Sequence, residues 1–359
     1  MNILLLSRYA NLGASSRIRS YQYLPYLRDH GISVTVSALL SDDYLRRMYT
    51  GQRPAFTAIL AGYIRRIGAL LKCRQYDLLW IEYELFPWLP GLVEVLGTAR
   101  RAPYLVDYDD AIFHRYDRHP NPLIRTVLGG KIDGVMRRAA LVVVGNEYLY
   151  DRAVAAGAQR VEILPTSIDL ARYVPSESVS HDPFTIGWIG SPATTRYLDQ
   201  VHGALAEFCA HRQAQVVLVG ASDPGWQDVP YRCHPWSEAT EVTEIGRFDV
   251  GIMPLEDSPW ERGKCGYKLI QYMACGKPVI ASPVGVNARI VEPGINGYLA
   301  ESKEDWLQAL TALIGDAGLR RQMGTNGRVK VERKFTIQVN GSRLVAMLRA
   351  VAGQDPCAA

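Results

Sequence analysis

The chain has 359 residues, of which 48% are hydrophobic and 21% are charged, and its formal net charge is +4. This composition is typical of a folded globular protein and argues against a disordered chain. Because the length exceeds what one core usually organises, we expect two domains of ordinary size.

The first half alternates short apolar runs with longer stretches of helical periodicity. Strands separated by helices form βαβ units, which build a parallel sheet covered on both faces. The predicted strands are residues 2–6, 32–36, 77–83, 103–108, 140–146 and 161–165.

Small residues follow the first predicted strand. At Gly13 and Ala14 the backbone amides can approach a ligand closely, at the start of a helix whose amides attract anions. Arg17 and Arg19 lie in the first turns, where a cation is unfavourable beside the positive end of the helix dipole. An anionic ligand would relieve that cost; the alternative is a capped helix with exposed arginines.

Residues 44–76 carry seven Arg or Lys and no Asp or Glu, with apolar residues at roughly helical spacing. A basic amphipathic segment suits an anionic membrane surface, where each cation contributes about 1 kcal/mol. The alternative is an ordinary helix with a solvated basic face. We keep an anionic membrane surface as a candidate partner of this segment.

Three aspartates, Asp107, Asp109 and Asp110, follow the fourth predicted strand, and His114 comes shortly after them. Carboxylates this close repel one another, which indicates that a task or a cation holds them there. The alternatives are aspartates that only cap a loop and a histidine that is structural.

The pattern breaks at residues 166–183, which are rich in Ser and Pro and predict a linker. We therefore expect an α/β chain of two Rossmann-like domains, at 1–170 and 184–359, joined by a linker at 171–183. The last helical stretch, from about residue 326 to residue 352, is expected to pack back on the first domain. Ligands bind beyond the carboxyl ends of parallel strands, so two facing sheets predict a substrate cleft between them. The predicted strands of the second half are residues 184–190, 214–220, 249–255, 277–283 and 297–300.

Two segments of the second half have the composition of ligand sites. Gly190 ends a predicted strand, and Thr194, Thr195 and Arg196 open a helix, where hydroxyls and free amides attract an anion. Hydroxyl capping without a ligand is the alternative. Further on, the loop around Trp236 can hold a flat base, although packing is the alternative role of the indole.

Residues 263–282 place Lys264 and Lys268 at the start of a predicted helix. The amides of Gly266 and Tyr267 would point along the helix axis, and each charge-assisted bond is worth about 1.5–3 kcal/mol. Gln271, one turn further, can bind vicinal hydroxyls. The segment therefore predicts a cradle for an anion.

The six cysteines show no CxxC spacing and no pairing with histidine, so metal or disulfide frameworks are not expected. The first residues lack the basic region and long apolar run of a signal peptide. No segment approaches the ~20 apolar residues of a membrane span. We expect a cytoplasmic protein, resting on the inner face of the membrane if residues 44–76 bind lipid.

The motif "QYMACGKPVIASPVG" at residues 271–285, with "EPGINGYLA" at 292–300, resembles the retaining GT-B-fold glycosyltransferases of family 4, the glycosyl transferases group 1. The usual signature has two glutamates. The second, which holds the ribose, is Gln271 here, and the first, which meets the donor sugar, falls on Gly263. Glu261, Asp257 and Glu256 are the candidates to replace it. The family's N-terminal catalytic histidine has no match, and residues 107–110 lie near its place.

This resemblance implies a metal-independent, retaining transfer of a sugar from a nucleotide-diphosphate sugar to a glycan or lipid-linked acceptor, in polysaccharide or lipopolysaccharide assembly. No cofactor is expected beyond the donor. The departing phosphate takes the acceptor proton, so no covalent intermediate and no conventional general base are assigned.

The resemblance also implies roles for the candidate residues, with the acceptor bound in the first domain and the donor in the second. Catalysis is assigned to Asp109, Asp110, Glu261 and Lys268. Donor phosphates are assigned to Gly13, Ala14, Thr194, Thr195, Arg196, Lys264, Gly266, Tyr267 and Lys268. The nucleoside is assigned to Gly190, His234, Trp236 and Gln271. The acceptor is assigned to Arg17, Arg19, Asp107 and His114.

Three other functions remain open on the sequence. A sugar-nucleotide epimerase of the same architecture would convert donor without acceptor, and a binding protein would bind donor without turnover. A metal-dependent transferase would use Asp107 and Asp109, whose DxD spacing matches the metal motif of another glycosyltransferase fold, and would lose activity with chelator. Nucleic acid is not expected, because the positive charge is local and no reader motif is present.

Overall fold

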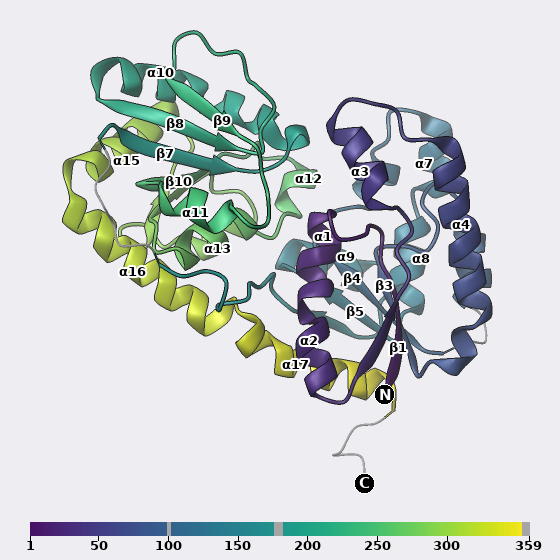
Figure 1. Cartoon of the computed structure of the whole chain (residues 1–359). Helices are drawn as coiled ribbons and strands as arrows, with labels where there is room; N and C mark the ends of the chain where they lie inside the picture. Colours follow the sequence, from purple (N-terminus) through teal and green to yellow (C-terminus); the bar gives the residue numbers. More distant parts are fainter. Residues whose placement is uncertain (99–101, 176–181, 354–359) are drawn as a thin grey trace. The chain divides into compact units, whose positions relative to one another are not determined.

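The computed structural model describes residues 1–98, 102–175 and 182–353 (Figure 1). The chain divides into two compact units. The first unit comprises residues 1–166, with 263–265 and the chain from Asn340 onward; the second comprises 167–262 and 266–339. Residues 176–181 of the expected linker lie outside the described residues.

The first unit is built on a sheet of six parallel strands in the order β2-β1-β3-β4-β5-β6, and Figure 1 shows helices packed around it. Every residue of β3, β4 and β5 is buried, as the continuous apolar runs of a doubly covered sheet require. The strands are β1 (Asn2–Leu6), β2 (Ser33–Val36), β3 (Leu78–Glu82), β4 (Tyr104–Tyr108), β5 (Leu141–Val144) and β6 (Val161–Ile163). The α-helices between them are α1 (Ala14–Arg19), α2 (Leu24–Asp29), α3 (Asp42–Tyr49), α4 (Phe56–Leu71), α5 (Gly91–Thr98), α6 (His114–Asp117), α7 (Pro122–Leu128), α8 (Lys131–Arg138) and α9 (Glu147–Ala155).

The second unit has its own sheet of six parallel strands, in the order β12-β11-β10-β7-β8-β9. Two parallel sheets confirm the predicted α/β class with two Rossmann-like units. The strands are β7 (Phe184–Ile189), β8 (Ala214–Val219), β9 (Tyr231–His234), β10 (Val250–Met253), β11 (Val279–Ala281) and β12 (Gly297–Leu299). The helical segments are η3 (Pro192–Gln200), α10 (His202–His211), α11 (Glu241–Gly246), α12 (Pro259–Arg262), α13 (Tyr267–Ala274), α14 (Asn287–Ile290), α15 (Lys303–Gly315) and α16 (Ala317–Lys334). The last helix, α17 (Ile337–Val351), begins in this unit and belongs to the first unit from Asn340 onward.

Helix α13 lies at the centre of the second unit, and residues 269–274 are all buried. Gly266, its N-cap, has φ +67°, and a Cβ there would lie 2.3 Å from the Ile290 side chain. Gly276 ends the helix with φ +71°, and a Cβ on Gly324 of α16 would lie 1.9 Å from the Gly276 carbonyl oxygen. Glycine therefore fixes both where α13 begins and how closely α16 packs against it.

The end of the chain differs from the single long helix that the sequence predicts. Helices α16 and α17 are separated at Phe335–Thr336, because the backbone there pairs with Ile168. The Ile168 amide donates to the Phe335 carbonyl, and the Ile337 amide donates to the Ile168 carbonyl, both at 2.9 Å. A backbone that bonds to another segment cannot continue the helical ladder.

The basic segment 44–76 forms two α-helices, the end of α3 and all of α4, where the sequence indicates one amphipathic stretch. Within the described part of the chain, no helix combines the length and apolar character needed to cross a bilayer.

Candidate functional site

In the first unit, polar side chains gather at the carboxyl ends of β1, β3 and β4. The strand register aligns Glu82 with Asp107, so the residues after both strands share one edge of the sheet. Asp109 and Asp110 are partly exposed there. The Tyr83 hydroxyl donates to Asp109, and Ser15 Oγ lies 3.2 Å from the same carboxylate oxygen. Asp109 is thus held in place while remaining accessible.

Glu82 also belongs to this group of polar side chains, and the sequence analysis missed it because it lies inside the predicted strand 77–83. Its Oε2 accepts hydrogen bonds from the Arg8 amide (2.8 Å) and from Ser16 Oγ (2.6 Å). Its Oε1 has no hydrogen-bond partner among the described residues. Burial raises the pKa of Glu82 to about 7, and the charge of Asp109 acts in the same direction.

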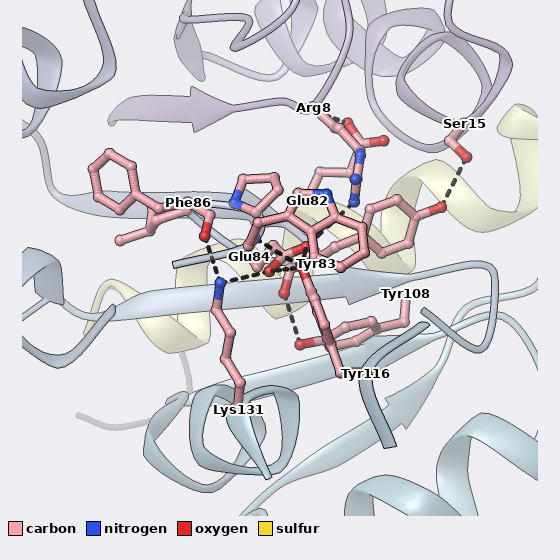
Figure 2. Close-up of polar contacts among 12 residues, drawn as sticks. Arg8, Ser15, Glu82, Tyr83, Glu84, Phe86, Tyr108, Tyr116 and Lys131 are labelled. Carbon is pink, nitrogen blue, oxygen red and sulfur yellow. Dashed lines mark hydrogen bonds and ion pairs between the residues drawn. The ribbon is translucent and has the colours of Figure 1, made fainter. Parts of the chain in front are cut away.

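The segment that follows β3 is strained and is held by several hydrogen bonds. Tyr83 and Trp88 have φ of +62° and +64°, a conformation that costs about 1–3 kcal/mol for such residues and recurs at functional sites. Figure 2 shows the polar groups that hold this segment. Tyr108 donates to the Tyr83 carbonyl (2.8 Å), and Lys131 Nζ donates to the Phe86 carbonyl.

Glu84, in the middle of this segment, is a buried carboxylate surrounded by donors (Figure 2). Its oxygens lie 2.7 Å from Lys131 Nζ and 3.4 Å from Arg8 Nη1, and they accept from the Tyr116 hydroxyl at 2.9 Å. Glu94 lies 3.2 Å from the same Lys131 Nζ. Two cations and two carboxylates therefore form one neutral buried cluster, which we call the Glu84 cluster.

Arg19 and Asp107 form a structural pair. Arg19 donates twice to the Asp107 carboxylate, at 2.8 and 3.0 Å, and once to the Leu164 carbonyl at 2.7 Å. Both side chains are buried, and burial raises the pKa of Asp107 despite this pairing. Neither side chain is exposed for an acceptor, so we leave them out of the proposed acceptor site.

The other candidates near the first strand have local roles. Arg17 is partly exposed and donates to the Asn11 carbonyl (3.0 Å). A Cβ on Gly13 would lie 2.2 Å from that of Tyr9, so Gly13 provides close packing where α1 begins, while Ala14 is exposed. His114 is bonded to Asp117 (2.8 Å) and to the Tyr148 hydroxyl (2.7 Å).

Residues 263–265 explain why glycine stands where the family signature has a glutamate. A Cβ on Gly263 would lie 2.5 Å from the Ala111 Cβ and 2.7 Å from its amide nitrogen. Asn146 Nδ2 donates to the carbonyls of Gly263 (2.8 Å) and Lys264 (3.0 Å), and Lys264 Nζ lies 3.7 Å from Asp110. A glutamate therefore has no room at 263, and Lys264 lies beside an acidic residue of the first unit.

In the second unit, Lys268 lies at the carboxyl end of β7. Its Nζ is 3.9 Å from the centroid of the buried Trp188 ring, a cation–π distance. A Cβ on Gly190 would come within 2.8 Å of the same Nζ. The missing side chain at Gly190 thus gives the ammonium room beside the end of the strand.

Glu261 lies near this end of the sheet but is buried and bonded. It accepts from the hydroxyls of Tyr197 and Ser258, and Arg196 Nη2 lies 3.3 Å away. The Arg196 side chain itself is 65% exposed. Asp257, one alternative to Glu261, pairs with Arg262 at 2.7 Å, whereas Glu256 is exposed.

The predicted threonines serve the loop after β7. Thr194 and Ser191 form a capping box at the start of η3, and Thr195 Oγ1 accepts from the Ser222 amide (2.9 Å). Capping, the alternative given by the sequence, therefore describes Thr194, whereas Thr195 bonds to the backbone of another loop.

Gln271 belongs to a hydrogen-bond network centred on the buried Glu241. The sequence analysis missed Glu241 because no motif marks it. Glu241 accepts from the Tyr173 hydroxyl (2.8 Å) and from Trp236 Nε1 (3.0 Å). Gln271 Nε2 donates to the Tyr173 hydroxyl (3.0 Å), which also lies 3.1 Å from the Tyr267 hydroxyl. The structure therefore brings Trp236, Tyr267 and Gln271 together, while His234 pairs separately with Glu244 (2.7 Å).

No three His, Cys, Asp or Glu side chains converge as metal ligands in the described ranges. The two aspartates of the DxD alternative bind different partners: Asp107 accepts from Arg19, and Asp109 accepts from Tyr83.

Comparison with known proteins shows that this chain is similar to glycosyltransferases. Residues 183–316 match the family model described as glycosyl transferases group 1. The D-inositol 3-phosphate glycosyltransferase of Kribbella flavida is 24% identical, over 81% of this chain and 75% of that protein.

Solved structures share the fold over nearly the whole chain. The sucrose-phosphate synthase of Thermosynechococcus elongatus superposes with a TM-score of 0.76 at 18% identity, covering 98% of this chain and 99% of that one. Anabaena HepE, solved in complex with UDP-glucose, superposes with a TM-score of 0.69 at 18% identity, covering 98% and 100%.

The raised pKa of Glu82 predicts a pH-dependent stability. Because this pKa is about 7 in the folded chain, against 4.5 for an ordinary glutamate, the folded state binds the extra proton between these values. The free energy of unfolding should therefore fall as the pH rises from 4.5 to about 7, by on the order of 3 kcal/mol from this group, and then level off. Glu82→Gln should remove this contribution, as measured by urea unfolding across the range.

The control for that experiment is Glu162→Gln, which changes a partly exposed carboxylate on β6 of the same sheet. For this control, the free energy of unfolding should vary with pH in the same way as for the unmodified chain. If Glu82→Gln also showed the same pH dependence as the unmodified chain, Glu82 would carry no proton at neutral pH.

Proposed function

We propose that this chain, a group 1 glycosyltransferase of GT-B fold, moves a sugar from a nucleotide-diphosphate sugar to a glycan or lipid-linked acceptor with retention of configuration. The observation that carries the proposal is the Lys268 ammonium beside Gly190 and Trp188, inside the matched region. Ligands of parallel sheets bind at this end of the strands. Binding of UDP-glucose by HepE, which has the same fold, supports a nucleotide sugar as donor.

In this reaction the enzyme must stabilise the negative charge that develops on the leaving group. Breaking the bond between sugar and diphosphate leaves negative charge on the phosphates, which the enzyme must stabilise more in the transition state than before it. We assign that task to Lys268 and Arg196, without a metal ion. The indole face of Trp188 excludes water on one side of Lys268, which strengthens its interaction with a phosphate.

The acceptor side of the reaction belongs to the first unit. In the proposed retaining mechanism the departing phosphate removes the acceptor proton, so no side chain is needed as a conventional base. Asp109, which is held by Tyr83 and Ser15, and the neighbouring Asp110 orient the acceptor hydroxyl. In the second unit Glu261 positions Arg196, because its carboxylate fixes one edge of that exposed guanidinium.

The cellular context that we propose is polysaccharide or lipopolysaccharide assembly at a membrane, with the protein on the cytoplasmic face. Helix α4 supports this, because one of its faces presents an apolar stripe to solvent. The side chains of the stripe are 48% to 75% exposed: Phe56, Leu60, Ile64, Ile67 and Leu71. Helices of this kind lie in the interface of anionic bilayers.

Not all the arginines and lysines of residues 44–76 are available to bind anionic lipid. Arg66 is buried and donates to the carbonyls of Ser7 and Ser37, and burial lowers its pKa to about 10. Arg53, Lys72 and Arg74 are exposed and remain available to anionic lipid.

Lys268→Ala is expected to weaken nucleoside diphosphate binding by about 10- to 100-fold, because one charge-assisted bond in a partly desolvated place is lost. Titration calorimetry with UDP, after a thermal-shift screen of UDP, GDP and ADP, measures this. Lys303→Ala is the matched control, since that lysine is exposed and pairs with Glu207. Equal affinity of Lys268→Ala and the unmodified chain would contradict the donor site.

Membrane binding is tested by pelleting the protein with vesicles that contain anionic lipid. We expect binding at low salt that weakens as salt is added. Ile64→Glu should reduce it by about tenfold or more, because it replaces an apolar side chain that would enter the bilayer. Leu123→Glu, on an exposed face of α7, should have little effect. If the protein did not pellet with anionic vesicles at low salt, the proposed membrane binding would be wrong.

A further inference from the structure

Two arginines of the first unit have guanidinium donors without partners among the residues that the structure describes. Arg8 is buried, and although its Nη1 reaches Glu84, its Nε has no hydrogen-bond partner among the described residues. Arg115 in α6 is partly buried, and within the described ranges its guanidinium makes no hydrogen bond or ion pair. Buried polar groups without partners are rare in native proteins and commonly mark the place of an ion or ligand.

The two arginines are electrostatically coupled. Burial, followed by the like charge of Arg8, lowers the pKa of the Arg115 guanidinium. The Glu84 cluster is neutral with Arg8 included, so none of its carboxylates is left over to pair with Arg115. Two cations within electrostatic range of each other, whose donors are not all used among the described residues, make an apo site that an anion would stabilise.

Aromatic rings surround the two guanidinium groups. The Arg8 Cζ lies 5.7 Å from the centroid of the Tyr9 ring and 5.9 Å from that of Tyr83. Tyr9 and Tyr44 have ring centroids 6.5 Å apart, and Tyr44 lies within electrostatic range of both arginines. The residues after β1 and β3 therefore lie near Tyr44 of α3, and Arg115 of α6 is within electrostatic range of Arg8.

Tyr83 connects this place to the proposed acceptor site. Its ring lies beside Arg8, and its hydroxyl donates to Asp109. Figure 2 shows Arg8, Tyr83 and Glu84 close together. An anion bound by Arg8 would therefore be separated by the Tyr83 side chain from Asp109, the carboxylate proposed to orient the acceptor hydroxyl.

We infer that Arg8 and Arg115 bind a phosphate group of the acceptor, a role that rests on the proposed function of the first unit as the acceptor site. One guanidinium fork satisfies both oxygens of a carboxylate, whereas a phosphate has further oxygens for a second fork. Two forks therefore favour phosphate. The acceptor class is a phosphorylated sugar or a lipid-linked phosphate, in which the reacting hydroxyl and the phosphate are held on either side of Tyr83.

The test uses the full chain and inorganic phosphate as the probe, with binding measured by titration calorimetry. Arg115→Gln should weaken phosphate binding by about tenfold, which is the loss of one charge-assisted contact. Arg118→Gln, which removes an exposed arginine three residues later, should change it by less than about twofold. Acetate should bind about tenfold more weakly than phosphate, because it occupies a single fork.

Two further measurements separate a phosphate site from a structural role of Arg115 and from phosphate binding at Lys268. Without phosphate, Arg115→Gln should keep or raise the melting temperature, because it removes like-charge repulsion; a clear decrease would show a structural role and overturn the inference. Lys268→Ala should retain this phosphate site. If Lys268→Ala abolished phosphate binding and Arg115→Gln did not, the acceptor phosphate site would be wrong while the donor proposal stood. Equal binding of acetate would replace phosphate by a carboxylate and overturn the assignment.

Discussion

The first unit depends on a buried carboxylate that two cations share. Glu84 lies between Lys131 and Arg8, with the Tyr116 hydroxyl on the same oxygens. Removing such charges from water is costly, and only full pairing and hydrogen bonding offset that cost. The Glu84 cluster meets this condition, because Glu94 supplies the second negative charge and also accepts from the amides of Leu85 and Phe86. The strained backbone at Tyr83 and Trp88 is held by these contacts.

The position of the proposed acceptor site follows from this cluster. Tyr83, whose backbone has a positive φ, donates its hydroxyl to Asp109. Arg8 is anchored at one nitrogen by Glu84, which leaves another nitrogen without a partner among the described residues. In the second unit, close packing sets the site instead. The absence of a side chain at Gly190 leaves room for the Lys268 ammonium, and Gly266 sets where α13 begins.

The sequence predicted the fold well and the sites unevenly. All the predicted strands are present, because apolar runs separated by helical periodicity leave few alternatives. Arg19 and Asp107 were predicted as ligands, but they lie 88 positions apart and the fold brings Arg19 of α1 against Asp107 of β4, which local patterns cannot show. Glu82, Glu84 and Glu241 were missed for the same reason, since a buried carboxylate is recognised only by the donors that the fold brings to it. Gly263 was noted as a departure from the family signature, and its physical cause is the backbone of Ala111.

The most direct test of this account is a double-mutant cycle between Glu84 and Lys131, with Glu84→Gln and Lys131→Met measured by unfolding in urea. Each single change should cost about 3–5 kcal/mol, because it leaves a buried charge without its partner. The double variant should recover about 2–3 kcal/mol of the summed loss, since both charges are then gone. Additive effects, with a coupling below about 0.5 kcal/mol, would show that the two residues do not act together and that another interaction holds the segment after β3.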